Sequence, residues 1–157
     1  MIDKKMRLSN TLKVNNIFIY DSAPSKQQVI GQLIGSLDLP DPTLALKAII
    51  DREEIGSTII APGVSFPHAR IPAIKQISAA LGICSAGIHD PKNSKAQPIH
   101  FYFLFVSPSE NIQDHLAFLA TASALFQKEK FVKQLLSLKE PSLVMDAIRK
   151  LEKGPKA

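Results

Sequence analysis

Residues 99–106 carry the sequence IHFYFLFV, which decides the fold class of the whole chain. Aromatic and β-branched residues are enriched in β-strands, and successive side chains of a strand point to its two faces in turn. One face of this strand therefore receives Ile99, Phe101, Phe103 and Phe105, and the other receives His100, Tyr102, Leu104 and Val106. Because both sets are mainly apolar, we expect a central strand that is covered on both sides.

Helix signals lie on either side of this strand. Upstream, Ser25 is a favoured N-cap residue, and apolar residues follow it at helical spacing between positions 29 and 37. Asp41 followed by Pro42 marks the start of a second helix, which Gly56 is placed to end. Downstream, the pattern predicts a helix capped by Asn111, a short helix near position 131 and a last helix that begins about position 141.

Shorter apolar segments predict the rest of the sheet, namely residues 17–20, 57–60, 64–66 and 77–85. Pro62-Gly63 is typical of a turn, and Pro67 keeps the residue before it out of helical geometry. His68 is therefore expected on a loop or at a strand end. This order of elements predicts an α/β fold, with a mixed β-sheet of about five strands flanked by helices on both faces in a three-layer sandwich.

Composition narrows the class of protein. The 157 residues are 45% hydrophobic and 21% charged, which suits one buried core and excludes a disordered chain. No apolar run approaches the roughly 18 residues that signal a membrane span, so we expect no membrane insertion. The charged start lacks the apolar stretch of a secretory signal, and the single cysteine, Cys84, excludes an internal disulfide. The expected location is the cytoplasm.

The basic balance of the chain is confined to its ends. The formal net charge is +5, and residues 1–13 and 149–157 each carry a net charge of +3. A nucleic-acid binder concentrates positive charge on a face of its folded body, because phosphate neutralisation drives its affinity. The body between these tails is close to neutral, so we expect no nucleic-acid partner.

Four histidines carry the candidate chemistry, because imidazole is a neutral nucleophile near pH 7. Their spacing matches no zinc motif, so no metal site is predicted. His89 lies in a polar loop and is expected to be solvated, and His100 is expected to be a partly buried, hydrogen-bonded residue of the strand. His68 follows a stiff turn, which either presents its ring for chemistry or merely ends a proline-rich loop.

Residues 52–58, REEIGST, hold a second candidate cluster. Arg52 together with the hydroxyls of Ser57 and Thr58 forms a donor set that suits a phosphate group. The alternative is that Arg52 only favours the helix dipole at a helix end and that the two hydroxyls are ordinary strand residues. His115 falls in the first turns of a helix, where an anion is favoured, or is simply a surface histidine.

Taken together, these segments resemble the enzyme IIA domains of the bacterial phosphotransferase system, fructose/mannitol type. The resemblance rests on REEIGST at 52–58, PGVSFPH at 62–68, the segment 98–108 and HLAFLA at 115–120, in that order and spacing. It covers roughly residues 15–152, which leaves 1–14 as a basic N-terminal extension and 153–157 as a C-terminal tail. The family fold agrees with the fold predicted above.

The resemblance implies a role for each matched position. His68 falls at the phosphorylated histidine, Arg52 at the arginine that helps to hold the phosphoryl group, and His115 at a second histidine of the active site. The implied donor is HPr or a paralogue, and the implied activity is that of a phosphotransferase-type phosphocarrier with a phosphohistidine intermediate that needs no cofactor. The chain departs from the family pattern at Val64-Ser65-Phe66 and at Ala69-Arg70, which concerns partner specificity more than chemistry.

Two branches of the family fit the chain. In the nitrogen-regulatory branch, which the length and the N-terminal extension favour, the domain controls partners by its phosphorylation state. In the sugar-specific branch it passes the phosphoryl group to a IIB domain for fructose- or mannitol-class uptake. A third hypothesis is a binding module that has lost the relay, although the presence of both His68 and Arg52 argues against it. A small hydrolase that uses His68 and His115 as base and acid lacks a nucleophile motif.

Overall fold

Strand β6 (Ile99–Pro108) lies inside the sheet, as its two apolar faces predict. The computed structural model describes residues 6–91 and 96–154, and β6 is hydrogen-bonded to β5 on one side and to β3 and β4 on the other. The remaining strands are β1 Leu12–Tyr20, β2 Ile59–Ala61, β3 Val64–Ser65, β4 His68–Ile71 and β5 Ser78–Ile88. Their order is β1-β5-β6-β3-β2, with β4 paired to β6 beside β3.

The sheet is mixed, as expected. β5 is antiparallel to β6 and β2 is antiparallel to β3, whereas the β1–β5, β3–β6 and β4–β6 pairs are parallel. The described residues form six strands, whereas the sequence predicts about five. The additional strand is β4. Pro67 separates it from β3, and pairing with β6 resumes directly afterwards, where His68 lies opposite Phe105.

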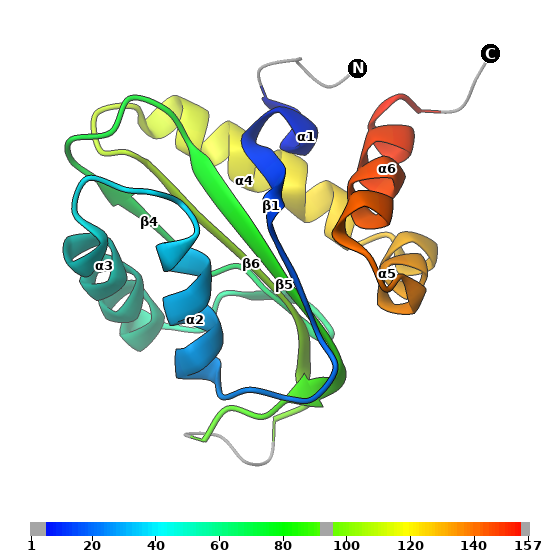
Figure 1. The fold of residues 1–157 in the computed structure, drawn as a ribbon. Coiled ribbons are helices and arrows are strands. Elements are labelled where there is room, and N and C mark those ends of the chain that lie inside the picture. Colours follow the sequence, from blue (N-terminus) through cyan, green and yellow to red (C-terminus); the bar gives the residue numbers. More distant parts are fainter. Residues whose placement is uncertain (1–5, 92–95, 155–157) are drawn as a thin grey trace.

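Helices cover both faces of the sheet (Figure 1). They are α1 Leu8–Thr11, α2 Lys26–Gly35, α3 Pro42–Ile55, α4 Ile112–Phe126, α5 Glu129–Ser137 and α6 Pro141–Glu152. The capping residues act as predicted: Ser25 forms a capping box with Gln28, and the side chains of Asp41 and Asn111 accept backbone N–H groups in the first turns of α3 and α4.

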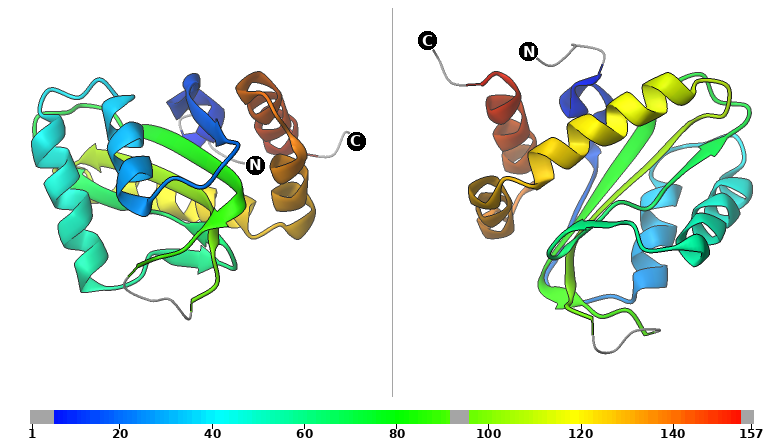
Figure 2. Two further views of the ribbon diagram at one scale, coloured as in Figure 1. Left: turned by 60° about the horizontal axis from the view of Figure 1, so that its bottom comes forward. Right: turned by 180° about the vertical axis from the view of Figure 1, so that it is seen from behind.

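Two separate cores lie on the two faces of β6. Phe101, Phe103 and Phe105 pack with residues of α1, α4, α5 and α6, and α4 crosses this face in the right-hand view of Figure 2. Tyr102, Leu104 and Val106 pack with residues of α2 and α3 on the other face. The alternation in residues 99–106 therefore predicted the three-layer arrangement correctly.

The N-terminal boundary differs from the expected one. Leu8 and Leu12 are fully buried in the core that contains α4, and the Ser9 hydroxyl donates a 2.5 Å hydrogen bond to the Glu152 carboxylate in α6. Residues 8–14 thus form α1 and the start of β1, so the boundary expected after residue 14 falls inside a strand. Within the expected extension and tail, residues 1–5 and 155–157 lie outside the described residues.

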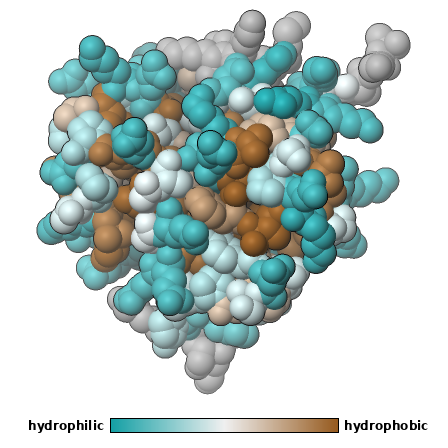
Figure 3. Space-filling model, in the orientation of Figure 1, coloured by the Kyte–Doolittle hydropathy of each residue, from teal (hydrophilic) through white to brown (hydrophobic). Residues whose placement is uncertain are grey.

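The face of the molecule seen in Figure 1 is mainly hydrophilic, with apolar side chains gathered near the outer strand β1, between α2 and the α5–α6 pair (Figure 3). None of the described helices is both long enough and apolar enough to cross a membrane.

Candidate active site

His68 is the first residue of β4, and its ring is held flat against the strand beside it. It stacks on the ring of Phe105, with centroids 5.2 Å apart and only 9° between the ring planes. Phe105 is fully buried and lies opposite His68 in the parallel β4–β6 pair. The core of the sheet therefore fixes the orientation of the half-buried imidazole.

A backbone carbonyl sets the tautomer of this imidazole. His68 Nδ1 lies 2.7 Å from the carbonyl oxygen of Phe66, which can only accept a hydrogen bond. Nδ1 therefore carries the hydrogen and donates it, so that the lone pair of the neutral ring is on Nε2. A lone pair of this kind is a nucleophile.

The surroundings favour the neutral form of His68. Burial lowers the pKa of His68 below its usual 6.5, and the positive charge of Arg52 adds to this effect. The hydrogen bond to Phe66 and the negative charge of Glu53 act in the opposite direction but are outweighed. The ring is consequently uncharged at neutral pH.

His115 lies directly beside His68, as the family resemblance implied, and it is buried rather than a surface histidine. It is in the first turn of α4 and is 6% exposed, and the two ring centroids are 5.3 Å apart. Its Nδ1 is hydrogen-bonded to the hydroxyl of Ser107, a fully buried residue near the end of β6. Burial, followed by the charges of His68 and Arg70, lowers the pKa of His115 to about 4, so this ring is neutral as well.

A surface depression brings the other predicted residues to His68. It has a volume of about 380 Å³ and is lined by His68, Arg52, Ser57 and Thr58, with a wall from α4 that includes Leu116 and Ser123. Arg52 is in the last turn of α3 and donates a 3.2 Å hydrogen bond to the Gly56 carbonyl. It therefore contacts its own helix end and also lines the depression.

The two hydroxyls differ in availability. Thr58 is buried, and it donates its single hydroxyl hydrogen to the Glu53 carboxylate at 2.5 Å. Ser57 is exposed, and its oxygen accepts a hydrogen bond from the Ile59 amide, which leaves its hydroxyl hydrogen able to turn toward the depression. Ser57 is thus the better placed hydroxyl donor of the pair.

Three residues of this site were not singled out as site residues from the sequence. Ser107 orients His115, Phe105 supports His68, and Glu53 accepts from Thr58. Ser107 follows an apolar strand and Glu53 lies in an ordinary charged helix end, so only the crossing of α4 over β6 and the packing of α3 reveal their partners. Phe105 was expected as a core residue.

The remaining histidines are as predicted. His89 is exposed, and His100 is half-buried with Nδ1 3.0 Å from the Cys84 carbonyl oxygen. Within residues 6–91 and 96–154, no three histidine, cysteine or acidic side chains gather in a way that suits a metal ion.

A family model of known proteins matches nearly the whole chain. Residues 10–151 match the family described as "Phosphoenolpyruvate-dependent sugar phosphotransferase system, EIIA 2". The chain belongs to this family. The resemblance noted in the sequence is thereby confirmed, and the chain contains an EIIA 2 domain.

Relatives of this EIIA domain come from both branches of the family. The "PTS system fructose-specific EIIABC component" of Bacillus subtilis is 28% identical over 94% of the chain, which spans only 24% of that protein. The "Nitrogen regulatory protein" of Bradyrhizobium diazoefficiens is 24% identical, and the match covers 79% of the chain and 82% of that protein.

Solved structures of EIIA proteins share the fold. The nitrogen regulatory protein IIA-Ntr from Neisseria meningitidis superposes with a TM-score of 0.79 at 19% identity, covering 90% of this chain and 98% of that one. The mannitol enzyme IIA in its complex with phosphorylated enzyme IIB from Escherichia coli gives a TM-score of 0.66 at 14% identity, covering 88% and 99%. These likenesses establish the α/β fold of the domain.

Proposed function

We propose that this EIIA domain is a phosphocarrier that accepts a phosphoryl group on Nε2 of His68 from an HPr-like protein. The observation that carries the proposal is the hydrogen bond from Nδ1 to the Phe66 carbonyl, which leaves the lone pair on Nε2. The same ring lines a depression with Arg52, whose positive charge suits an incoming phosphoryl group.

The reaction is an exchange of one phosphorus–nitrogen bond for another. The Nε2 lone pair of His68 attacks phosphorus while the bond to the donor's histidine breaks, and the donor imidazole leaves with the bonding electron pair. The Nδ1 hydrogen stays on His68, where the Phe66 carbonyl stabilises the positive ring that forms. Because both partners are imidazoles, the transfer is close to isoenergetic and reversible.

The site accelerates phosphoryl transfer by positioning the reactants and by stabilising the charge of the transition state. The transition state of phosphoryl transfer is loose, so the developing charge on the phosphoryl oxygens is what the site must hold. Arg52 and the Ser57 hydroxyl act on these oxygens. His115 contributes an Nε2–H donor when its Nδ1 accepts from Ser107, and Thr58 positions Glu53 at the edge of the site.

We further propose that the domain serves in nitrogen regulation, in the cytoplasm, and controls partner proteins through its phosphorylation state. The 24% identity to the nitrogen regulatory protein of Bradyrhizobium, of which the match covers 82%, supports this branch. The alternative is a sugar-specific component that passes the group to a IIB domain. The 28% identity to the fructose-specific Bacillus protein favours that alternative.

Radiolabelling tests the phosphocarrier proposal. Incubation with labelled phosphoenolpyruvate, enzyme I and HPr is expected to give an acid-labile label on the wild type and on His89→Ala, but none on His68→Ala. Arg52→Ala is expected to accept the label about 10²-fold more slowly, as when one donor to a transition-state anion is lost. A wild-type domain that stays unlabelled would leave only a binding module. Transfer of the label onward to a fructose- or mannitol-class IIB domain would support the sugar-specific branch.

A further inference from the structure

Arg70 is a charged residue of β4 that the proposed function does not use. It follows His68 by two positions, and successive side chains of a strand point to its two faces in turn, so the two residues share one face. The packing agrees, because Ala69 and Ile71 are buried in the core that contains α2 and α3. The ring of His68, by contrast, stacks on Phe105 in the opposite core. Arg70 therefore projects from the same side of β4 as the candidate nucleophile.

The pairing of β4 with β6 brings Arg70 close to His115. Arg70 lies opposite Ser107 in this parallel pair, and the hydroxyl of Ser107 is hydrogen-bonded to His115 Nδ1. After burial and the charge of His68, the positive charge of Arg70 contributes to the lowered pKa of His115. Each of the two imidazoles thus has one guanidinium group near it, Arg52 for His68 and Arg70 for His115.

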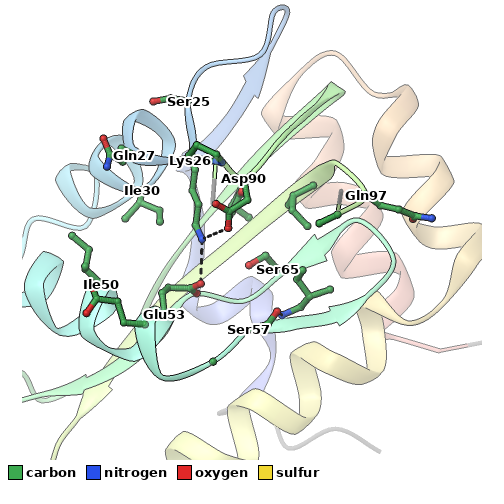
Figure 4. A pocket seen from close by; sticks show the side chains of 17 residues that line it. Ser25, Lys26, Gln27, Ile30, Ile50, Glu53, Ser57, Ser65, Asp90 and Gln97 are labelled. Carbon is green, nitrogen blue, oxygen red and sulfur yellow. Dashed lines mark hydrogen bonds and ion pairs between the residues drawn. The ribbon is translucent and has the colours of Figure 1, made fainter. Parts of the chain in front are cut away.

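The positive charge of the two arginines is not neutralised by the carboxylate that acts on His68. That carboxylate is Glu53, and one of its oxygens lies 3.4 Å from Lys26 Nζ in the neighbouring pocket, as a dashed line in Figure 4 shows. Within residues 6–91 and 96–154, neither Arg52 nor Arg70 forms an ion pair. The two neutral histidines therefore have two unpaired guanidinium groups beside them, an arrangement that suits a group with more than one negative charge.

The present contact of Arg70 leaves its side chain free to turn. Its Nη1 donates a 3.3 Å hydrogen bond to the backbone carbonyl of Ser109, and this is its one hydrogen bond to the described part of the chain. The residue is exposed and its guanidinium group has five N–H donors, so water can take over this contact. A strand rises about 3.3 Å per residue, which puts the Cα atoms of His68 and Arg70 about 6.6 Å apart. An extended arginine side chain spans that distance.

A phosphoryl group presents three acceptor oxygens and up to two negative charges, and the planar fork of one guanidinium group binds two oxygens. We propose that Arg70 is a second phosphoryl-binding arginine, which turns from the Ser109 carbonyl and donates to an oxygen of the phosphoryl group on His68. Arg52 holds the same group from α3. This inference depends on the proposed function, because it requires a phosphoryl group on His68.

Two donors of different size test the inference. Phospho-HPr reaches His68 through a protein interface, whereas phosphoramidate is a small donor whose phosphorus–nitrogen bond breaks as Nε2 attacks, so that ammonia leaves with the electron pair. We expect Arg70→Gln to slow labelling by about tenfold with both donors, as when one charge-assisted hydrogen bond is lost. Slowing with phospho-HPr alone would assign Arg70 to the choice of protein partner and would overturn the inference. Wild-type rates with both donors would overturn it as well.

The equilibrium with phospho-HPr gives a second measurement. The proposed contact persists in the phosphorylated domain, so Arg70→Gln is expected to lower the equilibrium ratio of phosphorylated to free domain at least threefold. An equilibrium ratio equal to that of the wild type would contradict a contact with the bound group.

Two further variants serve as controls. Arg70→Lys keeps the charge but loses the planar fork, so its labelling rate is expected to lie between those of the wild type and Arg70→Gln. Arg149→Gln removes an arginine that is in α6 and next to Asp146, and it should keep wild-type rates. Because all rates are compared with a wild-type domain that is labelled, a failure of this inference is distinct from a failure of the proposed function, in which the wild type itself stays unlabelled.

Discussion

At the scale of single residues, the site consists of two neutral imidazoles whose orientations have different origins. His68 is held through Nδ1 by a backbone carbonyl and is stacked on Phe105, whereas His115 is held through Nδ1 by the side chain of Ser107. The backbone therefore determines which ring nitrogen of His68 carries the lone pair. In His115, a single side-chain hydroxyl determines it.

Ser107→Ala tests this difference. The change removes the Nδ1 partner of His115 but leaves the Phe66 carbonyl and Arg52 in place, so we expect labelling of His68 to slow by about 10-fold to 10²-fold, the range of one positioned proton donor. The fold should persist, because the alanine keeps most of the volume. Stopped-flow transfer from phospho-HPr gives the rate, with the exposed Ser137→Ala as control. An unchanged rate would restrict Ser107 to packing.

The pH dependence of stability follows from His115. Its pKa is about 4 in the folded protein and about 6.5 when unfolded. Between these values the unfolded chain binds the proton and the folded chain does not, so stability falls as pH drops from 6.5 to 4, by roughly 3 kcal/mol from this group. Urea unfolding across this range should therefore give a shallower slope for His115→Gln than for the wild type. His89→Gln, at an exposed position, should keep the wild-type slope.

The sequence predicted which residues gather here but only part of what they do. His68, His115, Arg52, Ser57 and Thr58 were all candidates, and the structure brings them together. Their hydrogen-bond partners could not be predicted from the sequence. Thr58 contacts Glu53, and His115 contacts Ser107, only after the helices have packed on the sheet.

At the scale of elements, β6 organises the molecule because its alternating residues supply two cores. This alternation was visible in the sequence, since each face of the strand is apolar on its own. The separate strand β4 was not visible, because Pro67 interrupts the pattern and only four residues follow before the strand ends.

Leu104→Ala tests the burial of the β6 face that packs on α2 and α3. Leu104 is fully buried against α2 and α3, so the change is expected to lower the free energy of unfolding by about 2–5 kcal/mol. Leu143→Ala makes the same chemical change at a residue that is 45% exposed, and it should cost below about 1 kcal/mol. Similar losses in the two variants, measured by urea unfolding, would contradict the burial of this face of β6.

At the scale of the whole molecule, the first and last helices, α1 and α6, meet on one face of the sheet. α1 lies beside α6, and Ser9 and Glu152 are hydrogen-bonded across 143 positions of sequence (Figure 1). Basic residues near the start of the chain surround the apolar residues Leu8 and Leu12, which enter the core.

Leu8→Ala tests whether the first helix belongs to the folded body. Leu8 is completely buried, so we expect a loss of about 2–5 kcal/mol in the free energy of unfolding. Leu44→Ala is the matched control, because that leucine is 40% exposed in α3. Equal unfolding midpoints for Leu8→Ala and the wild type would mean that the N-terminal segment does not contribute to the stability of the domain.

The hydrogen bond between His68 and the backbone carbonyl of Phe66 also determines which point mutations can alter the site. Every amino acid that a mutated codon 66 can encode still supplies that oxygen, so point mutations there alter the benzyl group and spare the acceptor. Codon 107 has no such protection, since one missense change deletes the hydroxyl that pairs with His115. Residue 66 can therefore change during evolution while His68 keeps the same tautomer. A single mutation at position 107 can remove the hydrogen bond that orients His115.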